Sequence, residues 1–253
     1  MEKAVLIITG YWHVPEHYSR VISLLEQKGI RTICECFPTV KNPSPPFKTI
    51  HDDIRFIKDI VSKEVEKGTR LTVLCHSYGG VIASASLDEF AVTPGSAACK
   101  QGGVTSIIYM AAFVPFENQS LAGLLGDESI LRDFLDERPD GSCHVPHPIP
   151  TFYGDLSAKD AEWALRLYVP WCPVYPMLTP IPCDRVAWRS IPSTYIICET
   201  DCALLLVTQR RMIDDVRAQG VGMDEVSIKV DHSPFVNKPG EIVDIVISVM
   251  RRH

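Results

Sequence analysis

The sequence predicts an α/β fold in which a mostly parallel sheet carries helices on both faces, with a helical lid inserted between two strands of the sheet. Short apolar runs rich in β-branched residues alternate with longer segments of helical period. Runs such as LTVLC and SIIYM are apolar at almost every position, as is typical of strands covered on both sides. The 253 residues are enough for one such domain.

The elements can be placed in chain order from these patterns. In the second expected helix, apolar residues recur at spacings that put them on one helical face. The expected strands are Ala4–Ile8, Arg31–Cys36, Leu71–Cys75, Val104–Met110, Thr194–Cys198 and Val226–Val230. The expected helices between and after them are Glu16–Gln27, Ile50–Glu66, Gly80–Phe90, Val207–Ala218 and Glu241–Met250.

The alternation stops between residues 117 and 182. Two helix-like pieces, Ser129–Glu137 and Ala158–Leu167, precede the proline-rich run VPWCPVYPMLTPIP, which can continue neither helix nor sheet. About 65 residues make a marginal core for a separate domain. We therefore expect 117–182 to be a lid on a core formed by 1–116 and 183–253.

Charge and composition exclude some classes of binding partner. The formal net charge is −6, with 46% hydrophobic and 22% charged residues, which argues against nucleic acid or an anionic membrane as the partner. No apolar run approaches the roughly 20 residues of a membrane span, and MEKAVLIITG is typical of a first strand rather than a signal peptide. We expect a small-molecule substrate, and leave monomer and homodimer both open.

Cysteine usage bears on the compartment. The nine cysteines show no regular spacing, and several lie inside apolar runs, where cysteine behaves as a small hydrophobe. This pattern favours a reducing, cytoplasmic location. Neither Cys143-His144 with His147 nor the Cys34 and Cys36 pair supplies four ligands at a zinc spacing, so we expect no metal.

The strongest chemical signal is LTVLCHSYGG, residues 71–80. A buried strand runs into a small-residue turn and a helix follows at once, which is the setting of a nucleophile elbow, G-x-S-x-G. Ser77 is the candidate nucleophile, Gly79 fits the pattern, and Cys75 stands where glycine is usual. The alternative is a serine that caps the helix. His76, beside the nucleophile, is expected to be structural.

A serine nucleophile needs a base and an orienting acid, in the chain order serine, acid, histidine. The strand ending at Cys198 is followed by Glu199-Thr200-Asp201, and the next strand is followed by Asp231-His232. Strand carboxyl ends meet at one sheet edge. We expect His232 as base and Asp201 as acid, with Glu199 ranked second and Asp231 last.

The remaining pocket residues come from the first loop and the lid. The Tyr78 N–H at the helix start and the Tyr11 N–H in the loop after the first strand are the expected oxyanion donors. Gly10 lets the backbone approach a substrate closely, and Trp12 is a candidate pocket residue. His13 either lines the pocket or packs within its loop. The lid aromatics expected over the site are Trp163, Tyr168 and Trp171.

The chain resembles the α/β-hydrolase superfamily, and within it the methylesterase and hydroxynitrile-lyase group with its microbial relatives. LIITGYWHVPEHY, CHSYGG, IIYMAAFV, RSIPSTYIICETD and DHSPFVNKP carry the resemblance, and the lid is least matched. It implies Ser77, Asp201 and His232 as triad, with the Tyr11 and Tyr78 amides as oxyanion hole. The lyases carry threonine where this chain has Gly10 and lysine where it has Ser233, so the esterase side is favoured.

These observations predict a serine hydrolase without a cofactor that cleaves a small apolar ester or lactone. A hormone-like ester or a polyketide-type secondary metabolite would suit the apolar lid. One alternative keeps the site for non-hydrolytic chemistry, such as carbon–carbon cleavage or cyclisation. Another is a ligand receptor of the same fold, because fold alone does not fix function.

Overall fold

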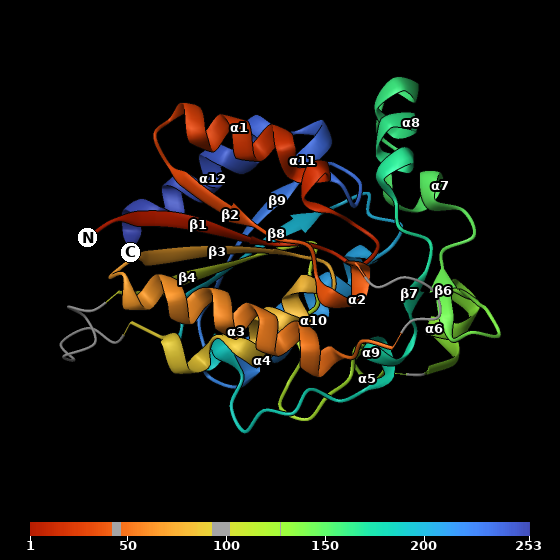
Figure 1. Cartoon of the computed structure of the whole chain (residues 1–253), viewed down its shortest axis with the longest axis horizontal. Helices are drawn as coiled ribbons and strands as arrows, with labels where there is room; N and C mark the ends of the chain where they lie inside the picture. The colour runs from red at the N-terminus through yellow and green to blue at the C-terminus, as the bar shows by residue number, and fades with distance from the viewer. Residues whose placement is uncertain (42–46, 93–101, 127) are drawn as a thin grey trace.

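A computed structural model describes residues 1–41, 47–92, 102–126 and 128–253. A six-stranded sheet lies at its centre, with strand order β2-β1-β3-β4-β8-β9 and every neighbouring pair parallel. The carboxyl ends of the strands therefore share one edge, on the right in Figure 1. The strands are β1 (Lys3–Ile8), β2 (Arg31–Cys34), β3 (Arg70–His76), β4 (Gly103–Met110), β8 (Ser193–Cys198) and β9 (Met223–Ile228).

Helices cover both faces of this sheet, as predicted. Figure 1 shows α1, α11 and α12 over one face and α3, α4 and α10 over the other. The bounds are α1 (Ser19–Gln27), α2 (Pro38–Lys41), α3 (Ile50–Glu66), α4 (Gly79–Ser86), α10 (Leu206–Ala218), α11 (Pro234–Asn237) and α12 (Pro239–Arg252). None of the helices in the described ranges combines the length and hydropathy that crossing a bilayer requires.

Each central strand contributes side chains to two hydrophobic cores, because successive side chains point to opposite faces of the sheet. In β1, Leu6 and Ile8 pack into the core beneath α3 and α4, whereas Val5 and Ile7 pack into the core beneath α1 and α12. Both sets are buried. This double burial explains why the strand sequences are apolar at nearly every position.

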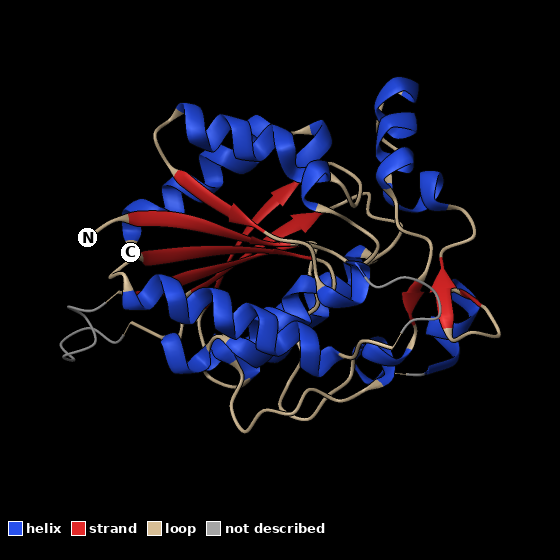
Figure 2. Cartoon of the chain, viewed as in Figure 1, coloured by secondary structure: helices blue, strands red, loops and turns tan. Residues whose placement is uncertain are grey.

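The described residues between 117 and 182 form five short helices and a second sheet, grouped beyond the strand carboxyl ends (Figure 2). The sequence predicts only helices here, so the small antiparallel sheet β5-β6-β7 is a correction. Its strands are two or three residues long, too short for a detectable alternation of side chains. The elements are α5 (Leu121–Leu125), α6 (Glu128–Phe134), β5 (Asp136–Glu137), β6 (Ser142–His144), α7 (Pro148–Phe152), α8 (Ala158–Leu167), β7 (Cys172–Pro173) and α9 (Tyr175–Leu178).

Other differences from the predicted elements lie at their ends. The last strand spans Met223–Ile228 rather than Val226–Val230. It is an edge strand, and its exposed Asp224 and Glu225 interrupt the apolar run by which the other strands are recognised in the sequence. The predicted helix Glu16–Gln27 begins as a 3₁₀ turn, Pro15–Tyr18, and the predicted helix Gly80–Phe90 ends as one, Asp88–Phe90. A further 3₁₀ turn, Ala187–Arg189, precedes β8. Cys99 lies outside the described residues.

Candidate active site

Ser77 occupies a sharp turn between β3 and α4. Its φ of 52° lies in the left-handed region, which is strained for a residue with a side chain. The backbone is locked there, because the Ser77 carbonyl accepts from Gly80 N at 3.0 Å and from Phe113 N at 3.1 Å. A Cβ on Gly79 would lie 2.6 Å from the carbonyl oxygens of Ile8 and Thr9. Glycine therefore lets the helix approach β1, and the turn has the geometry expected of a nucleophile elbow.

The Cys75 departure is accommodated in the sheet. Cys75 is fully buried, and its thiol donates to the Ile108 carbonyl at 3.4 Å. Burial raises the pKa of this thiol well above its usual value, so Cys75 packs as a small hydrophobe and is inert as a nucleophile.

His232 and Asp201 meet at the carboxyl edge of the sheet. His232 Nδ1 lies 2.7 Å from Asp201 Oδ2, and both side chains are buried. Asp201 Oδ1 accepts from the Ala203 N–H at 2.7 Å and the Leu204 N–H at 2.8 Å. With all these donors directed at it, the Asp201 carboxylate is held in one orientation and fixes His232 as the tautomer that carries its hydrogen on Nδ1.

The two competing carboxylates point elsewhere. Glu199 is exposed and accepts from Ser227 Oγ at 2.6 Å, on the neighbouring strand. Asp231 accepts from the backbone N–H groups of Asp155 and Ser233 at 2.9 Å and 3.0 Å. Burial raises the pKa of the Asp231 carboxyl. Among the three candidates, Asp201 is the one bonded to the His232 ring.

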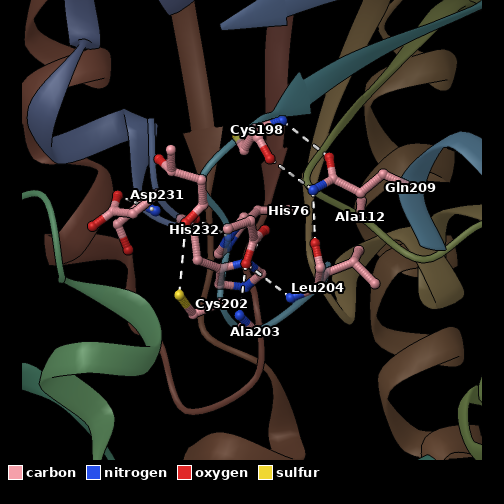
Figure 3. A network of polar contacts seen from close by, with 12 residues as sticks. His76, Ala112, Cys198, Cys202, Ala203, Leu204, Gln209, Asp231 and His232 are labelled. Carbon is pink, nitrogen blue, oxygen red and sulfur yellow. Dashed lines mark hydrogen bonds and ion pairs between the residues drawn. The ribbon is translucent and has the colours of Figure 1, made fainter. Parts of the chain in front are cut away.

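A buried glutamine fixes the loop that carries Asp201 (Figure 3). Gln209, on α10, accepts from Cys198 N at 3.0 Å and donates to the carbonyls of Cys198 and Leu204 at 2.9 Å and 2.7 Å. Both ends of the turn from residue 198 to 204 are thus bound to one side chain. Sequence reasoning missed Gln209, although a fully buried glutamine on a helix is a recognisable anomaly once burial is known.

The two candidate oxyanion amides come from adjacent turns. Tyr78 directly precedes α4, and Tyr11 follows β1. Their rings lie 4.6 Å apart, and their hydroxyls bond away from the site, Tyr11 to the Pro173 carbonyl at 2.7 Å and Tyr78 to Asp53 at 3.2 Å. In the described part of the chain, neither backbone N–H donates to a protein acceptor. Both are available to an oxyanion.

Ser77 and His232 open onto a cavity of about 270 Å³. Among the described residues, the ionisable side chains in its lining are His232, two tyrosines and one cysteine, and none is Asp, Glu, Lys or Arg. Most of its wall is apolar, which suits an uncharged organic ligand. The lining residues are Tyr11, Trp12, Ser77, Tyr78, Phe113, Leu121, Leu125, Ile130, Leu131, Phe134, Phe152, Met177, Cys202, Ala203, Leu204, Leu205, Thr208 and His232.

Several residues expected in the pocket lie outside this lining. Tyr168 is behind Trp12, with ring centroids 6.4 Å apart, and its hydroxyl accepts from Val145 N. Trp163, on α8, is half-buried and packs against His17 and Arg20. Trp171 is 41% exposed. Segment 117–182 reaches the cavity through aliphatic side chains, a methionine and two phenylalanines instead, none of which was among the pocket residues expected from the sequence.

Gly10 and His13 also lie outside the lining, for steric reasons. A Cβ on Gly10 would meet His76 Nδ1 at 2.6 Å, so glycine is required by close packing against His76 rather than by a substrate. His13 is buried, with Nδ1 2.7 Å from the Tyr11 carbonyl and Nε2 3.0 Å from the Tyr153 hydroxyl. It packs within its loop, the alternative left open by the sequence.

Four buried histidines form a row that leads away from the cavity, beginning at His232 in its wall. The ring centroids of His17 and His13 lie 4.7 Å apart, those of His13 and His76 5.5 Å, and those of His76 and His232 4.6 Å. Burial lowers the pKa of His13 and His76 well below the usual value and that of His17 to about 4. These three rings are therefore neutral at pH 7. The described residues contain no group of His, Cys, Asp and Glu arranged to hold a metal ion.

The fold and the elbow define an α/β-hydrolase, and comparison with known proteins agrees. The model of the alpha/beta hydrolase family matches residues 5–245, so the chain belongs to that family. Alpha/beta hydrolase nvfD of Aspergillus novofumigatus is 30% identical over 257 residues, covering 99% of this chain and 96% of that protein. Methylesterase 7 of Arabidopsis thaliana is 24% identical over 225 residues, covering 81% and 79%.

A solved structure shares the same fold. The methylesterase MES16 from Arabidopsis has a TM-score of 0.78 at 14% sequence identity, with 100% of both chains covered. The predicted resemblance to the α/β-hydrolase superfamily and its methylesterases is confirmed. Relatives named hydrolase and esterase support a hydrolase enzyme as the general class.

Proposed function

We propose that this protein is a serine hydrolase that cleaves a small, uncharged carboxylic ester or lactone with Ser77, His232 and Asp201. One observation carries the proposal: the His232 ring is held by Asp201 at 2.7 Å, and His232 shares an apolar cavity with the strained Ser77. A nucleophile, a base with a fixed tautomer and an orienting acid are the parts that acyl transfer requires.

In this mechanism His232 Nε2 takes the Ser77 proton while Oγ attacks the acyl carbon. The Tyr11 and Tyr78 amides stabilise the oxyanion, and Asp201 stabilises the imidazolium. His232 then donates its proton to the leaving alcohol, which leaves an acyl-Ser77. A water molecule, deprotonated by His232, hydrolyses this ester and releases the acid. The chemistry uses no cofactor.

The cavity favours a neutral substrate. A carboxylate or ammonium group would be desolvated there without an oppositely charged partner, which is strongly unfavourable. Methylesterase 7 is named for ester hydrolysis, and we transfer that bond type to this chain. A hormone-like ester or a polyketide-type product of secondary metabolism has the required neutrality and size.

Two positions favour an esterase over a lyase. Ser233 is uncharged, buried and outside the cavity lining, so position 233 supplies no positive charge to the site. At position 10, where the lyases carry threonine, the space that a side chain would need is occupied by His76.

For the cellular location, we propose the cytoplasm, because the cysteines of the described ranges are unpaired thiols.

The test compares wild type with Ser77→Ala on p-nitrophenyl acetate and butyrate. We expect a burst of nitrophenol from wild type and a loss of turnover of about 10³-fold or more in the variant, with an unchanged circular dichroism spectrum. Tight binding of the esters without turnover by wild type would instead indicate a receptor. Conversion of a metabolite extract into products other than an acid and an alcohol would indicate a lyase or cyclase.

A further inference from the structure

Three buried polar groups join the loop after β1 to the loop after β9. Gly10 N lies 2.8 Å from the Tyr18 hydroxyl oxygen, and that oxygen lies 2.8 Å from His76 Nδ1. On the other side of the ring, His76 Nε2 lies 2.9 Å from the His232 carbonyl oxygen. Tyr18 and His76 are both fully buried, and neither lines the cavity. We call this chain of hydrogen bonds, from Gly10 through Tyr18 and His76 to His232, the relay.

The direction of each hydrogen bond in the relay is fixed by its two ends. A peptide N–H only donates and a carbonyl oxygen only accepts, so Gly10 donates to Tyr18 and His76 Nε2–H donates to His232. A neutral His76 then has Nδ1 as its acceptor, which takes the Tyr18 O–H. Every polar group is satisfied in this one arrangement. Protonation of His76 would leave the Tyr18 hydroxyl hydrogen without its acceptor and place a charge beside His232.

Packing holds the relay in place. The Tyr18 ring stacks on Phe235 with centroids 4.3 Å apart, and the His76 ring meets Phe235 at 4.9 Å and His232 at 4.6 Å. His76 appears beside His232 in Figure 3. Gly10 has no side chain because His76 fills the space in which it would lie. The two loops therefore share one rigid, buried contact.

We propose that Tyr18 and His76 are positioning residues, which hold the Tyr11 amide and the His232 ring in register with Ser77 although neither touches the substrate. The inference rests on the proposed function. The peptide that follows Gly10 carries the Tyr11 N–H, so the hydrogen bond to Gly10 sets one oxyanion donor. The hydrogen bond to the His232 carbonyl sets the backbone of the base. Displacing the Tyr11 amide or the His232 ring by a fraction of an ångström reduces stabilisation of the transition state more than it reduces substrate binding.

The first experiment uses Tyr18→Phe, which removes one oxygen and keeps the ring stacked on Phe235. Gly10 N–H and His76 Nδ1 both lose their partner. We expect kcat for p-nitrophenyl acetate to fall about 10- to 100-fold while KM changes less than about twofold. Tyr109→Phe is the matched control, because it also removes one buried, hydrogen-bonded hydroxyl, which pairs with Ser84 Oγ at 3.0 Å and makes no hydrogen bond to the relay.

A second pair of variants separates positioning from folding. His76→Gln keeps one donor and one acceptor and should retain several-fold more kcat than His76→Leu, which keeps neither, at similar thermal melting temperatures. Tyr18→Phe combined with His76→Leu should be no slower than the slower single variant, because both break one unit. Rescue of kcat by glutamine at an unchanged melting temperature is an effect that a purely structural role would not produce.

The outcomes are distinguishable. If Ser77→Ala is inactive but Tyr18→Phe matches Tyr109→Phe in kcat, the relay proposal is overturned and the hydrolase proposal stands. Equal losses of melting temperature and kcat in both phenylalanine variants overturn it as well. If Ser77→Ala keeps wild-type turnover, or wild type hydrolyses no ester, the proposed function fails and the relay proposal fails with it.

Discussion

Replacing Asp201 by asparagine changes one atom at the contact with His232. In the native site Asp201 Oδ1 accepts two backbone N–H groups, from Ala203 and Leu204, while Oδ2 faces His232 Nδ1. An asparagine must keep its oxygen toward the two amides, since reversing it would set its NH₂ group against both. Its NH₂ group therefore faces His232 Nδ1 and forces the hydrogen of the ring onto Nε2. That tautomer cannot accept the Ser77 proton.

The expected loss in kcat is on the order of 10⁴-fold, the scale seen when a triad base is held as the wrong tautomer. KM should change little, because Asp201 does not line the cavity. The assay is steady-state hydrolysis of p-nitrophenyl acetate, with Glu199→Gln as the matched control. Glu199 is exposed and bonded to Ser227, so its variant should lose less than about 10-fold. An Asp201→Asn enzyme within about 10-fold of wild type would refute the assignment of the acid.

Three further predictions address the loop, the lid and pH. Gly10→Ala places a methyl group 2.6 Å from His76 Nδ1, so the free energy of unfolding should drop by about 1–3 kcal/mol and kcat by about 10-fold or more; an unchanged denaturation midpoint and kcat would contradict the packing argument. Phe134→Ala should lower kcat/KM for phenyl butyrate about 10-fold and for methyl acetate less than about threefold, and equal losses would remove Phe134 from the acyl or alcohol subsite. Burial raises the pKa of Asp53 to about 7, against the hydrogen bonds from Thr39 and Tyr78. The folded state then binds more protons than the unfolded state between pH 4 and 7, so unfolding free energy should fall by on the order of 1 kcal/mol or more as pH rises through this window. A urea titration of Asp53→Asn with the same pH slope as wild type would contradict that origin.

The central sheet and the elbow could be predicted because both are local in the sequence. A strand such as β1 is apolar on both faces whatever lies beside it, and the start of α3 is marked by the Thr49 and Asp52 capping box. Ser77, Asp201 and His232 could be ordered because strand ends of a parallel sheet share one edge. The choice between Asp201 and Glu199 needed the turn geometry, since side-chain direction two residues apart depends on the loop.

The cavity wall could not be predicted in the same way. Its lid residues, such as Leu125 and Phe134, come from short helices whose orientation is set by tertiary packing rather than by period. The large aromatics Trp163 and Trp171 were expected over the site because pockets are often lined by aromatic side chains, yet Trp163 packs against His17 and Arg20, and Trp171 is exposed. The relay was hidden for another reason. Tyr18 and His76 are 58 positions apart, and nothing in either local pattern links them.

The most direct test of the account is mass spectrometry of the enzyme quenched within its first turnovers on p-nitrophenyl acetate. We predict one acetyl group on the peptide that contains Ser77, formed with the kinetics of the nitrophenol burst and absent from Ser77→Ala. The acetyl group should persist longer in Asp201→Asn, because hydrolysis of the acyl-enzyme needs the same base. Rapid wild-type turnover with no acylated Ser77 at any quench time, or with acetyl on another residue, would contradict the serine mechanism.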